Sequence, residues 1–154
     1  MSELLDRLEA GVILADGAMG TMLHSRGVSF DKCFDELNLT NPAAVAQLHH
    51  EYVDSGAQLI LSNTFGANRF KLGKHGLESQ VREINRAGVE LARRAAQAAA
   101  SLVLVAGDLG QPRRGERRHE VIIRPPGRPC QGQSALPPGD REVRSPALRF
   151  SSES

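Results

Sequence analysis

The chain has 154 residues, of which 40% are hydrophobic, and 19 lysines and arginines against 18 aspartates and glutamates leave a formal net charge of +1. This length suits one domain with its own core, and the balanced charge argues against a dedicated nucleic-acid or membrane-surface binder. The longest uninterrupted apolar run, residues 102–106, is far shorter than the roughly 20 residues that a membrane-spanning helix needs.

The chain contains two cysteines, Cys33 and Cys130, and its first residues show no basic region that leads into an apolar stretch. Secretory leaders have such a region, and small secreted domains are rich in cysteine. We therefore expect a cytoplasmic protein with free thiols and no membrane partner.

Composition changes near Gly110. Residues 1–110 contain 10 basic residues, 13 acidic residues and one proline, whereas residues 111–154 contain nine arginines, five acidic residues and seven prolines. The second segment has too few apolar residues to offset the entropy that it would lose on ordering. We expect a disordered Arg/Pro-rich tail over residues 111–154, in which residues 120–124 alone suit a short strand. The tail has a single aromatic residue for base stacking, so we expect no nucleic-acid partner.

The first predicted elements lie within residues 2–20. Leucines at positions 4, 5 and 8 form an apolar stripe at helical spacing, with Ser2 as the N-cap and Gly11 as the end of the helix. Residues 12–15 form a short apolar run that a glycine-containing loop follows. A run of this kind predicts a fully buried strand that leads into a tight loop.

The next element is the clearest helix of the chain. Asn41 can cap it and Pro42 suits its first position, while apolar side chains recur at three- and four-residue spacing through positions 45–53. Gly56 follows as the end. His49 lies on the apolar stripe, so we predict that it is a core histidine rather than a ligand.

Two further strands and one helix complete the predicted pattern. Residues 59–61 and 102–106 are short apolar runs closed by polar residues and glycine, and apolar positions from Val81 onward predict a helix that extends through residues 98–100. Strand, helix, strand, helix and strand in this order imply parallel pairing with right-handed crossovers, and hence an α/β fold. The pattern alone fits either an open doubly wound sheet or a TIM barrel.

Both architectures would gather the polar residues that follow the strands on one rim. After the first strand, Asp16 precedes a glycine-rich turn whose backbone amides can bind an anion, while the carboxylate can pair with a cation. An amino acid carries both charges, although Asp16 could equally cap the turn. After the second strand, residues 62–68 provide small hydrogen-bonding groups and Phe65 as an aromatic wall, which suits a small-ligand pocket or an ordinary Asx-rich turn.

Four separated motifs carry a resemblance to a known family. They are Asp16-Gly17-Ala18-Met19-Gly20-Thr21, Asn38-Leu39-Thr40-Asn41-Pro42, Gly56-Ala57 and Ser62-Asn63-Thr64-Phe65-Gly66-Ala67-Asn68. In this order they resemble the homocysteine S-methyltransferase family, in particular the homocysteine-binding module of cobalamin-dependent methionine synthase and of the bifunctional homocysteine methyltransferase/methylenetetrahydrofolate reductase. The resemblance covers residues 4–110. It implies a TIM barrel, of which residues 1–110 form the N-terminal portion with the first three strand-helix units.

The resemblance also implies a substrate and its binding residues. The substrate is homocysteine, whose thiol receives a methyl group to give methionine. Asp16 would accept the ammonium group, and the backbone amides around Gly17, Ala18 and Met19 would meet the carboxylate. Ser62, Asn63 and Thr64 would line the pocket.

The family's zinc ion is held by three cysteines, one alone and an adjacent pair, and binds the homocysteine sulfur as a thiolate. Neither Cys33 nor Cys130 lies in such a motif, so we assign no metal ligand and no catalytic residue to this chain. We expect a truncated or frame-shifted family member that is inactive alone, with cobalamin or folate as methyl source in full-length relatives. The alternative is a non-catalytic binding or assembly module that pairs with a complementary barrel fragment or with itself.

Overall fold

A short sheet forms the centre of the structure. The computed structural model describes residues 3–110 and 123–124 of the chain. β1 (Leu59–Leu61) pairs in parallel with β2 (Leu104–Ala106), and β3 (Ile123–Arg124) pairs antiparallel with β2. The strand order is β1-β2-β3, so β2 lies in the middle. The described residues therefore form a mixed α/β structure that contains two of the predicted parallel strands.

Residues 12–15 differ from their prediction. They run parallel to β1, but the pairing is limited to one bridge, between Ala15 and Leu59. Val12 is 93% exposed and Leu14 is 55% exposed, so the prediction of a fully buried strand is wrong here. The physical reason is that these two side chains meet no covering layer within the part of the chain that the structure describes. The described residues therefore do not show three complete strand-helix units.

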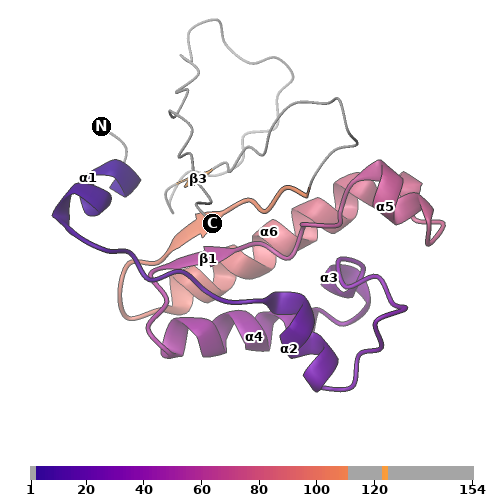
Figure 1. Ribbon diagram of the computed structural model, residues 1–154, viewed down its shortest axis with the longest axis horizontal. Helices are drawn as coiled ribbons and strands as arrows, with labels where there is room; N and C mark the ends of the chain where they lie inside the picture. The colour runs from indigo at the N-terminus through magenta and orange to yellow at the C-terminus, as the bar shows by residue number, and fades with distance from the viewer. Residues whose placement is uncertain (1–2, 111–122, 125–154) are drawn as a thin grey trace, which may run out of the picture.

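The predicted lead-in helix is confirmed as α1 (Glu3–Ala10). It ends where expected. The amide of Gly11 makes the last helical hydrogen bond, to the carbonyl of Arg7 at 3.0 Å. None of its residues is buried, and Figure 1 shows it apart from the other helices. The guanidinium group of Arg7 donates to the carbonyl of Leu102 at 3.1 Å and so ties α1 to the segment before β2.

Two long helices pack against each other and against the sheet (Figure 1). α4 (Pro42–Asp54) begins as predicted, with the side chain of Asn41 accepting from the amide of Ala44. α6 (Val81–Ala98) covers the helix predicted from Val81 onward and ends within two residues of the expected end. The turn after α4 includes Gly56 at a φ of +99°, a conformation that glycine adopts without steric cost.

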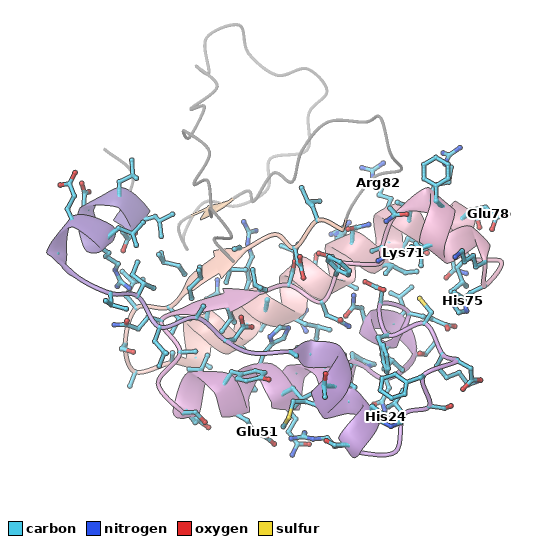
Figure 2. All side chains as sticks on the ribbon, in the orientation of Figure 1. His24, Glu51, Lys71, His75, Glu78 and Arg82 are labelled. Carbon is cyan, nitrogen blue, oxygen red and sulfur yellow. The ribbon has the colours of Figure 1, made fainter. Side chains whose placement is uncertain are left out.

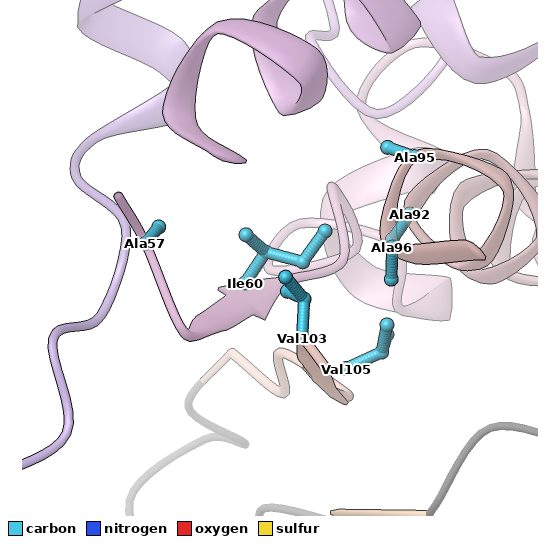
Figure 3. Close-up of a cluster of buried hydrophobic side chains, with 7 residues drawn as sticks. All are labelled: Ala57, Ile60, Ala92, Ala95, Ala96, Val103 and Val105. Atoms are coloured by element: carbon cyan, nitrogen blue, oxygen red, sulfur yellow. The ribbon is translucent and has the colours of Figure 1, made fainter. Parts of the chain in front are cut away.

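The main core lies between the sheet and α6. Ile60 of β1 and Val105 of β2 lie with Val103 and the small alanines of α6 (Figure 3). The cluster comprises Ala57, Ile60, Ala92, Ala95, Ala96, Val103 and Val105. Alanine side chains leave room for the helix to approach the strands closely, which excludes water from the apolar faces.

Four short helical segments were not predicted from the sequence. They are α2 (Met19–Ser25), α3 (Leu37–Thr40), α5 (Arg69–Gly73) and a 3-10 turn at Glu78–Gln80. Each is too short to show a clear apolar period. Leu23 of α2 and Leu72 of α5 are nevertheless completely buried, so tertiary packing stabilises these turns.

The predicted tail lies almost entirely outside the described residues. Residues 111–122 and 125–154 are not described, so its disorder stays a prediction. Ile123 and Arg124 form β3, within the segment that the sequence marks as a short strand. Among the helices of the described residues, none combines the length and the apolar character needed to cross a membrane.

Candidate functional site

A pocket of about 790 Å³ lies where residues 12–15, β1 and β2 end. Its walls come from the loops that follow these three segments, from residues 32–35 and from α5 with its C-terminal turn. Ligands bind at this place in parallel α/β folds, because the loops after the strands converge there. Six of the predicted site residues line the pocket, namely Asp16, Gly17, Ala18, Met19, Ser62 and Asn63.

Asp16 has one satisfied and one unsatisfied carboxylate oxygen. Oδ2 accepts from the amide of Leu61 at 3.0 Å, which links the loop after residues 12–15 to the end of β1. Oδ1 is buried and has no hydrogen-bond partner among the described residues. Burial, followed by repulsion from the carboxylate of Asp108, raises the pKa of Asp16 to about 6. A cation at Oδ1 would offset both effects.

Residues 17–19 form the turn that leads into α2. The hydroxyl of Tyr52, on α4, donates to the carbonyl of Ala18 at 3.3 Å and holds this turn. A Cβ atom at Gly17 would lie 3.0 Å from the same hydroxyl oxygen, so glycine permits the close approach of the ring. Met19 is the first residue of α2, and no side chain caps that helix.

Ser62, Thr64 and Asp108 form a closed ring of hydrogen bonds. The amide of Asp108 donates to Ser62 Oγ at 3.2 Å, and Thr64 Oγ1 donates to the carbonyl of Asp108 at 2.8 Å. The two hydroxyl oxygens lie 2.7 Å apart, so the Ser62 hydroxyl donates to that of Thr64. Thr64 was expected to line the pocket, but it lies outside the lining and acts on it through Ser62. The ring joins the loop after β1 to the loop after β2.

Asn63 is held by a residue that sequence analysis did not assign to the site. Its Nδ2 donates to the carbonyl of Phe34 at 2.8 Å and to Oδ1 of Asn38 at 3.0 Å. Asn38 Nδ2 in turn donates to the carbonyls of Asn63 and Ile84. Asn38 belongs to the second of the family-like motifs, but its partner 25 positions away could not be inferred from the sequence.

Asp35 is the second residue that sequence analysis missed. Its side chain is only 8% exposed and lies in the pocket wall. Oδ1 accepts from the amide of Gly66 at 2.8 Å, and Oδ2 lies 4.0 Å from Cys33 Sγ. Burial raises the pKa of this carboxyl group, while the Gly66 hydrogen bond and the nearby Lys71 oppose the increase. Asp35 therefore orients the loop after β1 through its hydrogen bond to Gly66.

His49 is completely buried, as predicted for a core histidine. Neither ring nitrogen has a hydrogen-bond partner among the described residues. Burial, with a smaller contribution from His50, lowers its pKa to about 4, so the ring is neutral at physiological pH. Cys33 is buried with a free thiol, and Cys130 lies outside the described residues. Within the described ranges, no three His, Cys, Asp or Glu side chains are grouped so as to hold a metal ion.

The fold and the pocket together define an α/β protein with a cavity beyond the ends of its parallel strands, the place where such folds bind small molecules. Comparison with known proteins gives the family. The family model for homocysteine S-methyltransferase matches residues 13–117. This chain belongs to the homocysteine S-methyltransferase family.

Relatives of this chain include two methionine synthases. That of Mycobacterium tuberculosis is 34% identical over 119 residues, which is 73% of this chain and 9% of the relative. That of Mycobacterium leprae is 35% identical over 101 residues, which is 62% of this chain and 8% of the relative. The chain thus spans less than a tenth of the length of these relatives.

Solved structures of the homocysteine methyltransferase MmuM from Escherichia coli are also similar. The metallated form has a TM-score of 0.62 and 30% identity, over 71% of this chain and 41% of that one. The oxidized form has a TM-score of 0.58 and 30% identity, over 64% of this chain and 37% of that one. The chain matches about two fifths of these structures.

Proposed function

We propose that residues 1–110 are the N-terminal portion of a homocysteine-binding (β/α)8 barrel and that the pocket binds the amino-acid end of homocysteine. Family membership and the likeness to a homocysteine methyltransferase support this proposal. In the same proposal the protein is cytoplasmic, and residues 111–154 form a separate Arg/Pro-rich tail.

One observation carries the substrate assignment. Asp16 lines the pocket with a buried carboxylate oxygen that has no hydrogen-bond partner among the described residues. The ammonium group of an α-amino acid would supply the missing donor and the missing positive charge in one charge-assisted hydrogen bond. Because the pKa of Asp16 is about 6, its carboxylate is ionised at neutral pH and available for that contact.

The rest of the amino-acid site consists of the residues beside Asp16. We propose that the backbone amides of Gly17, Ala18 and Met19 meet the substrate carboxylate. Ser62 and Asn63 form the facing wall, and Thr64 supports Ser62 through the hydroxyl-hydroxyl contact. Ser62 and Asn63 are held by hydrogen bonds to their neighbours, so the wall is ordered before a ligand binds.

Methyl transfer in the proposed reaction needs a thiolate at the homocysteine sulfur, and zinc supplies it in the enzymes that the chain resembles. The residues of this chain do not fit such a centre, because its two cysteines are fewer than the three that the resemblance implies. Cys33 is buried beside a carboxylate, and burial raises the pKa of its thiol. We propose that this chain binds the amino acid but does not transfer methyl groups alone, whether cobalamin or folate is the donor.

Isothermal titration calorimetry with L-homocysteine tests the assignment. We expect saturable binding to the full chain and a loss of about tenfold or more in affinity for Asp16→Asn, because the substituted amide carries no charge to pair with the ammonium. Asp54→Asn is the matched control, because it removes the same charge from an exposed position of α4. 4-Mercaptobutanoate is homocysteine without the ammonium group. It should bind weakly, and with equal affinity, to the wild type and to Asp16→Asn. Equal affinity of the wild type and Asp16→Asn for homocysteine would refute the role of Asp16.

A second candidate function is favoured by the apolar side chains that remain exposed. Val12 and Leu14 beside β1, and Leu5 and Leu8 on α1, are between 43% and 93% exposed. Open sheet edges with apolar side chains pair readily with another chain. This is the expected surface of an assembly module that docks on a complementary barrel fragment. Analytical ultracentrifugation of the chain, alone and mixed with the remaining part of a related barrel, would test this function. The assembly module requires that the mixture contain a one-to-one complex.

A further inference from the structure

The pocket is larger than an amino acid requires. Homocysteine has about eight non-hydrogen atoms, whereas pockets of roughly 300–1,000 Å³ hold drug-sized molecules. The pocket here measures about 790 Å³. Space for a second molecule therefore remains when an amino acid occupies the part next to Asp16.

Four of the side chains that line the pocket are basic. Lys71 belongs to α5, and Lys74 and His75 follow in its C-terminal turn, while Lys32 comes from the loop before α3. Figure 2 shows Lys71 and His75 projecting toward the α3 side of the molecule, whereas Arg82 projects the other way. Two chain segments that are about 40 residues apart thus bring four basic side chains to one pocket.

The acidic and basic side chains of the lining come from different elements. Asp16 follows residues 12–15 and its carboxylate is bonded to the amide of Leu61, whereas Lys71 and Lys74 belong to α5 and its C-terminal turn. Asp35 lies near both Asp108 and Lys71, because its pKa responds to both.

The lysines of the pocket lining have acidic neighbours but form no ion pair among the described side chains. Asp31 is close to Lys32 and His75, and Asp35 is close to Lys71. Lys71 Nζ lies 4.0 Å from the centroid of the Phe65 ring, which also lines the pocket and holds the ammonium group by a cation–π contact. Among the described side chains, the ion pairs of 4.0 Å or less join Arg7 to Glu3, Arg26 to Glu51 and Arg86 to Glu90, and none includes these lysines.

We propose that the pocket binds a second, anionic molecule beside the amino acid, and that Lys71, Lys74 and Lys32 hold its carboxylate or phosphate groups. The proposal deepens the proposed function and rests on it only for the identity of the first ligand. Two lysines on one helical turn and a third from a facing loop can surround an anionic group with several ammonium donors. The aromatic face of Phe65, which is 48% exposed, is the neighbouring apolar wall.

Calorimetric titration of the full chain with two probes, inorganic phosphate and succinate, tests the anion site at fixed ionic strength. We expect saturable binding of at least one probe, and the probe that binds identifies phosphate or carboxylate as the recognised group. The double variant Lys71→Gln and Lys74→Gln should weaken binding by about tenfold, because ammonium-anion contacts are lost. Arg82→Gln with Arg94→Gln removes the same charge from exposed positions of α6 outside the pocket, and should change affinity by less than about twofold.

The same samples separate this proposal from the amino-acid assignment. Asp16→Asn should lose homocysteine and keep the anion probe, whereas the lysine variant should do the reverse. Binding of an anion without binding of homocysteine would refute the amino-acid assignment alone. Absence of saturable binding for both probes, or equal weakening in the lysine and arginine variants, would overturn the anion site. Lys74→Gln alone, at an exposed position, repeats the test if the double variant does not fold.

Discussion

The carboxylate of Asp35 lies directly against the backbone of Gly66. Oδ1 accepts from the Gly66 amide at 2.8 Å, and a Cβ atom at position 66 would fall 2.2 Å from Oδ2. The two residues are 31 positions apart, and both line the pocket. Their contact joins the loop before α3 to the loop after β1, and no side chain larger than hydrogen fits between them.

Gly66→Ala should destabilise the protein by about 1–3 kcal/mol, because the new methyl group forces Asp35 out of its position. Gly73→Ala is the matched control, since a Cβ atom there would meet Glu78 Cβ at an ordinary 4.0 Å. Chemical denaturation with urea measures both variants. Equal stability of the two would show that the Asp35 contact is not a constraint.

Asn38→Ala should cost about 1–3 kcal/mol, because the carbonyls of Asn63 and Ile84 and one donor of Asn63 lose a partner in a buried region. Gln47→Ala removes an amide on the exposed face of α4 and should change the free energy of unfolding by less than about 0.5 kcal/mol. A loss for Asn38→Ala no larger than that for Gln47→Ala would contradict the role given to the amide pair.

His49 should make the protein less stable in acid. Its pKa is about 4 in the folded chain against 6.5 for the unperturbed group, so the unfolded state binds more protons between these values. The contribution of neutral His49 to the free energy of unfolding is fully present above pH 6.5. It is lost as pH falls toward 4, by about 3 kcal/mol in total. His49→Leu should abolish this part of the pH dependence. The measurement is the difference in unfolding free energy between the two proteins at pH 7 and pH 4, and a constant difference would count against the prediction.

Asp16→Asn should stabilise the protein at neutral pH while it weakens homocysteine binding. The folded pKa of Asp16 is raised from 3.8 to about 6, so the folded state binds more protons than the unfolded state between these values, and stability falls as pH rises through this range until the loss is complete above about pH 6. Because Asp16 is partly accessible to solvent, we expect a gain of only about 1 kcal/mol. Thermal unfolding should show a higher Tm for Asp16→Asn at pH 7.5 and little change at pH 3.5. Asp54→Asn, at an exposed position of α4, is the matched control.

Local sequence determined most of the regular elements. α4 has its own cap at Asn41, its proline at the first position and a full apolar stripe, so its limits followed from residues that are close together in the chain. The short apolar run at residues 59–61 coincides with β1. The short helices α2, α3 and α5 were missed because burial of single residues, such as Leu72, stabilises them, and that burial depends on distant segments.

The motifs in the sequence by themselves indicated the family and predicted six of the residues that line the pocket. Only the tertiary structure decided that Thr64 acts through Ser62, that Asp35 and Asn38 hold the loop after β1, and that Val12 and Leu14 stay exposed. The physical reason is that local propensity depends on neighbours a few residues away. Hydrogen-bond partners and burial in this pocket depend instead on segments about 25 to 45 positions apart, which meet only when the strands and helices pack.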